Sequence, residues 1–372
     1  MRPHPPAPGP DGDTELADAH PPAPVHYAEQ ALLGALLLEP ERLDGIALAP
    51  EQFGDPAHST LYAAMRATPV PNPEQHRRSP AWLNRVLEAA RPQAPGLTAS
   101  YLHTLVQRCP WPGHAAAYAR MIEADHARIT LREHAERLAQ SATDPSLPDR
   151  AGTVLAECDA LSRFLDMLSS QFAPHPGSLP RTVLSASVPR TTGDEVLAEE
   201  RALLACATAQ PSGLRRMRWL QPDDFALPRH GQLFQCLTAL AHRQEPVDAV
   251  TVLWEAQHQH LLHSDFTPAD LMELLATPVG TPEHWGEKVL QRALLAQAHD
   301  TALRIRALTD APANTPHQLA TGSRRALAAL TALRTRWQRA TQPLTATHSP
   351  AINRTGPRLR TTAASPTTRA SR

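Results

Sequence analysis

Three closely spaced histidines have the chemistry of metal ligands. His258, His260 and His263 offer imidazole nitrogens, which bind Zn²⁺ and related ions in proteins. On a helix, His260 and His263 would share a face while His258 would point away, and only Asp265 is placed to complete a ligand set. Because the chain contains 19 histidines, we interpret the group as a chance cluster and predict no metal site.

Two further histidines, His58 and His230, stand at matched positions in two similar segments, each two residues after a proline. A functional interpretation makes them contact residues for a partner. We favour a structural one, in which each histidine starts a helix and bonds the local backbone. Upstream of them, Glu29 and Glu199 or Glu200 are interpreted as charges in the first turn of a helix, where they complement its dipole.

The sequence contains no motif for ATP hydrolysis. An ATPase motor needs a G-x-x-x-x-G-K-S/T loop, whose backbone N–H groups and lysine bind the phosphates. The only lysine is Lys288, and its surroundings, G-E-K-V, do not fit that loop. The patterns G-x-S-x-G and H-E-x-x-H do not occur either. We therefore predict no catalytic residue and no cofactor, and we expect that the chain is not an enzyme.

The matched histidines belong to an internal repeat. The segment Leu48–Tyr62 aligns with Leu220–Phe234 at an offset of 172 residues, and both contain proline, acid, phenylalanine, proline and histidine in one register. Upstream, Glu29–Leu33 aligns with Glu200–Leu204 at an offset of 171 residues. A repeat of this length predicts two copies of one folded unit.

The apolar residues of both copies have helical spacing. Leu32, Leu33, Leu36 and Leu37 fall on one face of a helix, and no segment alternates with the period of a strand. Thr267 before Pro268 is typical of a helix start. We therefore predict an all-α fold with two small helical bundles, each followed by a further long helix.

Composition predicts where these units begin and end. Proline-rich and polar stretches flank both copies, and such stretches cannot bury enough apolar surface to fold. The predicted organisation is a disordered N-terminus, a first copy, a linker, a second copy and a disordered arginine-rich tail, at residues 1–24, 25–170, 171–193, 194–338 and 339–372.

The charge distribution is uneven although the formal net charge is only −1. After Asp310 the chain has ten arginines and no acid. Such a segment could bind nucleic-acid phosphates without reading sequence. It could equally be a solubilising tail in an arginine-rich protein, since the chain has 35 arginines and one lysine. The candidate nucleic-acid contacts are Arg334, Arg336, Arg339, Arg354, Arg358 and Arg360.

The four cysteines show neither C-x-x-C pairs nor metal-ligand spacing. They are typical of reduced, mostly buried residues in a cytoplasmic protein. The sequence has no secretory signal, and no apolar run approaches the length of a membrane span.

The repeated motifs resemble a known family. Residues 28–38 read A-E-Q-A-L-L-G-A-L-L-L, and residues 48–58 follow the pattern L-x-P-E-x-F-x-x-P-x-H. Residues 246–253 add P-V-D-A-V-T-V-L in the second copy. In this order the motifs resemble the N-terminal domain of the hexameric bacterial replicative helicase, called DnaB-like. The helices at 150–168 and 317–336 look like the linker helix that joins this domain to the motor.

The resemblance implies a role in DNA replication. In that family the N-terminal domain packs into a ring collar through dimers and trimers, and it receives primase and, in some systems, loaders. We expect a non-catalytic interaction module of the primosome that binds the helicase, the primase or both, with possible homo-oligomers. We also expect Leu32, Leu33, Leu36 and Leu37 to divide between the core and a partner helix.

Two alternatives remain open. The chain could be a dimerising scaffold of a plasmid or phage, with its arginine-rich tail as a DNA-binding anchor. It could also be a decaying helicase remnant without a present role, although the intact helix signals in both copies argue against this.

Overall fold

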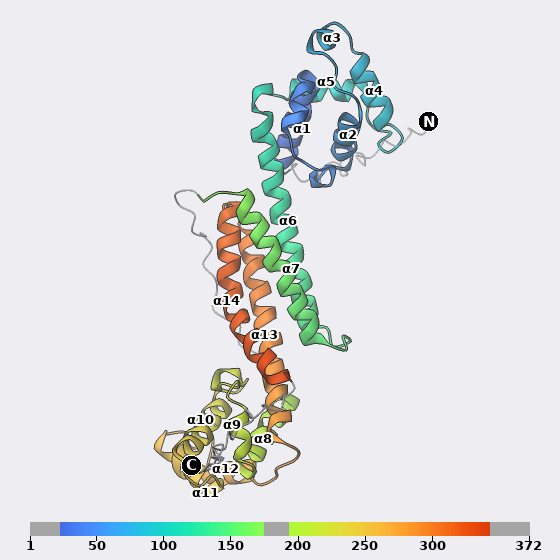
Figure 1. The fold of residues 1–372 in the computed structure, drawn as a ribbon. Helices are drawn as coiled ribbons and strands as arrows, with labels where there is room; N and C mark the ends of the chain where they lie inside the picture. The colour runs from blue at the N-terminus through green and yellow to red at the C-terminus, as the bar shows by residue number, and fades with distance from the viewer. Residues whose placement is uncertain (1–22, 175–192, 343–372) are drawn as a thin grey trace, which may run out of the picture.

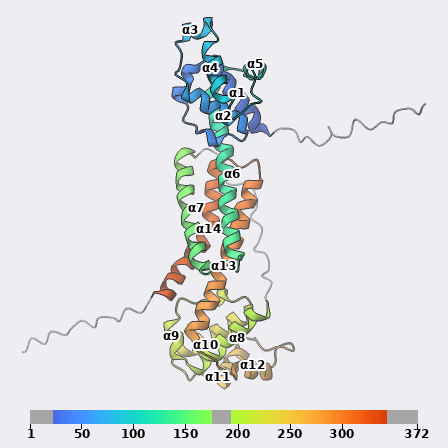
Figure 2. The same ribbon diagram turned by 90° about the vertical axis from the view of Figure 1, so that its right-hand side faces the viewer.

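The computed structural model describes residues 23–174 and 193–342, and within these ranges all regular structure is helical. The β-type pairing described there is one isolated bridge between His263 and Phe266. Two globular heads lie at opposite ends of a central bundle of four long helices (Figure 1). The view turned by 90° shows the same arrangement (Figure 2). The prediction of an all-α protein with two helical domains is confirmed.

Each head consists of short helices. In the first head these are α1 (Pro24–Leu38), α2 (Pro56–Ala67), α3 (Pro73–Arg78), α4 (Ala81–Ala90) and α5 (Ala99–Gln107), with 3-10 turns at Pro40–Gly45, Pro50–Gln52 and Pro112–His114. In the second head they are α8 (Asp194–Ala209), α9 (Ser212–Arg216), α10 (Pro228–Arg243), α11 (Ala249–His258) and α12 (Pro268–Leu275), with a 3-10 turn at Pro222–Asp224.

Prolines and capping side chains fix where many of these helices begin. Pro56 starts α2, and the side chain of Asp55 accepts a hydrogen bond from the Ala57 N–H at 2.8 Å. At α12, Thr267 and Asp270 form a capping box, in which each side chain bonds the other residue's backbone N–H. The predicted helix start at Thr267 is therefore confirmed.

The leucines of α1 form the centre of the first head. Leu32, Leu33, Leu36 and Leu37 are at most 2% exposed and pack in one apolar cluster with residues of α2, α4 and α5. Gly34 allows α5 to approach α1 closely, because a Cβ at this position would lie 2.2 Å from the carbonyl oxygen of Leu105.

Two helical hairpins build the central bundle. The first hairpin is α6 (Ala115–Thr143) with α7 (Arg150–Gln171), and the second is α13 (Pro282–Asp310) with α14 (Pro316–Thr341). Both α6 and α13 have 29 residues, and their buried positions correspond at an offset of 167. This correspondence extends the repeat into the hairpins.

The two hairpins pair with each other and lie antiparallel. Arg132 of α6 forms an ion pair with Asp310 at the end of α13, while Glu136 faces Arg306 at 4.0 Å. The apolar core of this bundle is continuous with that of the second head, whereas the first head has a separate core. The chain therefore contains an internal dimer, with the two copies joined through their hairpins.

The helix that was predicted to follow each bundle is present in both copies. The helices at 150–168 and 317–336 lie within α7 and α14, where they are the second arms of the hairpins. Helix α14 also continues to Thr341, beyond the predicted boundary at 338. Most of the segments predicted as a disordered N-terminus (1–24), a linker (171–193) and a disordered tail (339–372) lies outside the described residues, while Pro24 begins α1 and residues 339–341 belong to α14. No described helix is both long and apolar enough to cross a membrane.

Candidate functional site

Each head contains a buried glutamate–histidine pair. In the first head, Nδ1 of His58 lies 2.6 Å from Oε2 of Glu29, and both side chains are fully buried. In the second head, Nδ1 of His230 lies 2.7 Å from Oε2 of Glu200. The expectation that these histidines bond the local backbone is therefore wrong, because their partner is a carboxylate on another helix.

The same glutamates hold the turn before the next helix. The Gly54 N–H donates to Oε1 of Glu29 at 2.6 Å, and the Ala226 N–H donates to Oε1 of Glu200 at 2.5 Å. Both glutamates lie inside a helix and not in its first turn, which corrects the sequence interpretation. A buried carboxylate with two donors of this kind is a structural clamp between helices.

The first head extends its pair into a larger polar network. The Tyr101 hydroxyl lies 2.7 Å from Nε2 of His58. Arg108 donates to Oε1 of Gln30 at 2.6 Å, and the amide nitrogen of Gln30 lies 2.8 Å from Nε2 of His26. Burial raises the pKa of the Tyr101 hydroxyl. The network ties α1, α2 and α5 together.

Part of this network could in principle hold a metal ion. Ligand atoms of His26, Asp55 and His58 all lie within 4.8 Å of one another. However, both ring nitrogens of His58 already have partners, and the Gln30 amide donates to Nε2 of His26, while Nδ1 of His26 lies 3.8 Å from Asp55. At these hydrogen-bonded positions the histidines serve the fold, and we assign no metal to them.

The histidine cluster found in the sequence does not assemble. Nδ1 of His258 bonds the carbonyl oxygen of Trp254 at 2.8 Å, and the backbone of His263 pairs with Phe266. Among the described residues, the group that could share an ion is the one around His58, which lies in the other head.

Arg128 joins the two copies at the first junction, where the tip of the second hairpin (309–316) meets α6. Its guanidinium donates to the carbonyl oxygens of Thr309 and Ala311, both at 2.9 Å, and to that of Asn314. Burial lowers the pKa of Arg128. The arginine thus binds carbonyls at the end of α13 that helix geometry leaves without intrahelical partners.

Two of the predicted nucleic-acid contacts are occupied by ion pairs. Arg334 donates to Asp159 of α7 at 3.1 Å, and this hydrogen bond holds the pKa of Asp159 below its usual range. Arg336 forms two hydrogen bonds with the buried Asp224 of the second head. Arg339 is exposed. The remaining candidates, Arg354, Arg358 and Arg360, lie outside the described residues.

The leucines proposed to contact a partner are not accessible. The structure places Leu32, Leu33, Leu36 and Leu37 entirely in the core of their own head, which leaves none of these side chains exposed to a partner helix. Buried side chains occupy so much of the surface of α1 because the rest of the head surrounds this helix.

Exposed apolar side chains lie elsewhere on the heads. On α11, Val250 is 64% and Trp254 is 65% exposed, while Val252 and Ala256 on the opposite face are buried. In the first head, Trp111 is 61% exposed. Nothing in the sequence marks Val250 and Trp254 as exposed, because an i, i+4 apolar pair on a helix is also typical of a core face.

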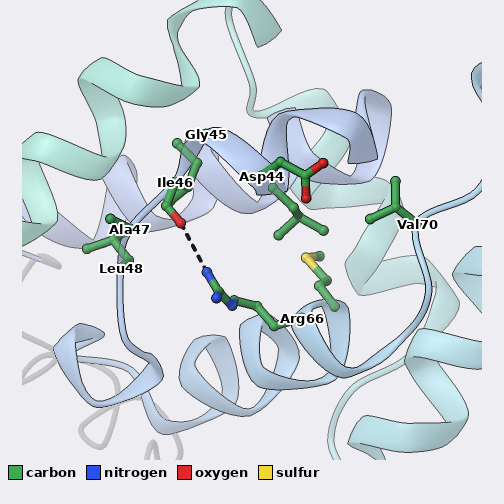
Figure 3. A pocket seen from close by; sticks show the side chains of 9 residues that line it. Asp44, Gly45, Ile46, Ala47, Leu48, Arg66 and Val70 are labelled. Atoms are coloured by element: carbon green, nitrogen blue, oxygen red, sulfur yellow. Dashed lines mark hydrogen bonds between the residues drawn. The ribbon is translucent and has the colours of Figure 1, made fainter.

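A pocket of about 450 Å³ lies in the first head between the 3-10 turn after α1 and the end of α2 (Figure 3). The lining consists of Leu43–Leu48, Met65, Arg66 and Val70, and Figure 3 shows Arg66 facing Ile46 across the pocket. Arg66 donates to the Ile46 carbonyl at 3.0 Å, so its charge is directed at the backbone. The lining offers no acid–base or nucleophilic set.

The cysteines are free within the described residues. Cys158, Cys206 and Cys236 are buried, and Cys109 is partly buried. Burial raises the pKa of Cys158 and of Cys236 to about 12. Such thiols are poor nucleophiles, so they are packing residues.

Comparison with known families decides the ancestry of this fold. The model of the DnaB-like helicase N terminal domain matches residues 21–124 and matches again at 194–287, which is more than half of the chain. The chain belongs to this family. Both DnaB-like segments contain a whole head and end within the long helix that follows it, which confirms the tandem duplication. No curated protein and no solved structure matches the chain.

Proposed function

We propose that the chain is a non-catalytic interaction module of DNA replication. It presents two DnaB-like N-terminal domains as one preassembled pair and binds the replicative helicase, the primase or both. The observation that carries this proposal is the internal pairing of the hairpins, which leaves the two heads at opposite ends of the bundle. A partner can therefore bind at a head while the hairpins stay paired.

The exposed face of α11 supports a docking role for the second head. Val250 and Trp254 follow each other by one helical turn and point away from the core. Tryptophan is among the residues that contribute most to protein interfaces. The buried residues Trp82 and Val86 of α4 correspond to Val252 and Ala256 of α11. In this alignment the first head has Pro80 and Asn84 at the positions of Val250 and Trp254.

Co-purification with the helicase and the primase of the same organism tests the proposal. The full chain should retain at least one of them at micromolar concentration, and the double variant Val250→Ser, Trp254→Ser should weaken that binding by about tenfold or more. Met167→Ser, which removes an exposed apolar side chain from α7, is the matched control and should bind normally. If neither protein is retained by the full chain, the proposal fails.

The scaffold with a DNA-binding tail is distinguished by truncation. Residues 343–372 carry five arginines and no acid. If the alternative holds, removing them should abolish salt-dependent DNA binding. A replication module of the proposed kind should keep its protein partner after the same truncation.

A further inference from the structure

A second pocket lies at the second junction, where the tip of the first hairpin (142–150) meets α13 and the second head. Its volume is about 340 Å³, within the range of small-ligand sites. Most of the lining is apolar, with Val196, Val289 and Leu295 among its residues. The pocket exists only because the two copies are paired, since each copy contributes part of its wall.

Three nitrogen atoms of residues around this pocket are buried without a hydrogen bond. They are Nε of Arg150, Nη1 of Arg292 and Nδ1 of His299. The other ends of the arginines are fixed, because Arg150 donates to the Ala142 carbonyl and Arg292 forms an ion pair with Glu199. A buried polar atom without a partner is costly, so three of them at one pocket require an explanation.

The carboxylates at the pocket do not provide the missing partners. Glu200 accepts from His230 and the Ala226 N–H, and Asp224 binds Arg336 through both oxygens. Both acids line the pocket but are already engaged. Glu199 pairs with Nη2 of Arg292, and its Oε2 makes no hydrogen bond with any of the three nitrogens. The three nitrogens therefore have no hydrogen-bond acceptor among the described residues.

The first junction shows how the same space is filled when the chain itself supplies the polar group. There Arg128 occupies the position that corresponds to Leu295, at the offset of 167 that relates α6 to α13. Arg128 binds the carbonyl oxygen of Thr309, and the residue equivalent to Thr309 at the second junction is Ala142. With a shorter, apolar leucine in place of the arginine, the second junction retains an open pocket.

We propose that this pocket binds a small organic oxyanion, a phosphate monoester or a carboxylate on an apolar body. The oxyanion accepts hydrogen bonds from Arg150, Arg292 and His299, and the apolar body packs against the aliphatic wall. The ligand then joins the tip of the first hairpin to the second head, as Arg128 joins the copies at the other end.

Calorimetric titration of the full chain with phenyl phosphate, benzoate and inorganic phosphate tests this site. At least one organic probe should bind with a Kd of about 1 mM or tighter. Inorganic phosphate should bind about tenfold more weakly than that probe, because it cannot use the apolar wall. The site is refuted if neither organic probe binds, or if inorganic phosphate binds as tightly as they do.

Two variants locate the binding. Leu295→Trp places a larger side chain without charge in the lining, so it should fill the pocket and weaken the binding by about tenfold or more. His299→Leu removes a single donor and should also weaken it. Met167→Ser, on the exposed face of α7, should leave it unchanged, and melting curves check that all variants fold. Undiminished binding by the Leu295 or His299 variant overturns the proposal.

Discussion

At the scale of single residues, the buried glutamates decide how each head is held together. Glu29 and Glu200 are charged groups that water does not reach, and each accepts hydrogen bonds from a histidine and a backbone N–H. Desolvation makes such a charge unfavourable unless its partners are in place. The pair therefore enforces the packing of two helices in each head.

Replacing one member of the pair in the second head should lower the stability of the protein more than replacing both members. His230→Leu leaves the carboxylate of Glu200 without its main partner, and we expect a loss of about 3–5 kcal/mol in the free energy of unfolding. The double variant Glu200→Leu, His230→Leu should lose less, because no buried charge remains. Urea unfolding of the three proteins measures this, and a double variant less stable than the single one would contradict the clamp.

His134 should make the hairpins sensitive to pH. Burial, and secondly the charge of Arg137, lower its pKa, and its ring lies 5.2 Å from that of Phe164. An unfolded histidine has a pKa of about 6.5, so as the pH falls the unfolded chain takes up the proton first. The contribution of His134 to stability is complete above about pH 6.5 and is lost as the pH falls through its folded pKa.

The urea midpoint should accordingly decrease between about pH 7.5 and pH 5.5, and the decrease should be smaller in His134→Gln. The chain has other histidines, so the difference between the two proteins, and not the total change, is the relevant quantity. Identical pH profiles would show that His134 titrates alike in the folded and unfolded chain.

At the scale of elements, the two hairpins have diverged into complementary partners. Residues 115–171 contain nine acids and six arginines, whereas residues 282–341 contain nine cations and four acids. Arg324 pairs with Asp166 at 2.6 Å, and Arg334 pairs with Asp159. Opposite net charges favour the pairing of one hairpin with the other over the pairing of two identical ones.

Arg128 forms the main hydrogen bonds that stabilise the first junction. Arg128→Leu gives this junction the residue of the second one and leaves several carbonyls at the tip of the second hairpin without their donor. We expect a loss of about 3 kcal/mol in stability and faster amide exchange at the tip. Arg120→Leu, on the same helix but exposed, is the control and should change stability little.

At the scale of the whole molecule, the two copies should stay together without the connecting segment. Cleavage at a protease site introduced within residues 175–192 should leave one particle of unchanged size in size-exclusion chromatography, because the hairpins share a continuous core. High salt should weaken the association only in part, since the ion pairs are screened but the apolar core is not. Separation into two halves after cleavage would refute the internal dimer.

The sequence predicts the fold class and the repeat because both depend on local patterns. The spacing of Leu32 and Leu36, or the capping motif at Thr267, is visible in a few neighbouring residues. The glutamate–histidine pairs join residues that are far apart, and nothing near His58 identifies Glu29 as its partner. The pairing of the hairpins is equally hidden, because an amphipathic helix does not reveal what covers it. For the same reason Arg334 and Arg336 suggested a nucleic-acid surface, although they bind acids of this chain.

Arg128 at one junction and Leu295 at the other have a consequence for how such a molecule can evolve. In a dimer of identical subunits, every mutation appears on both sides of the symmetry axis, so an improvement at one end is imposed on the other. Here one gene encodes both sides separately. Each end of the particle is free to acquire its own specialisation, and the pair forms in a one-to-one ratio even at extreme dilution.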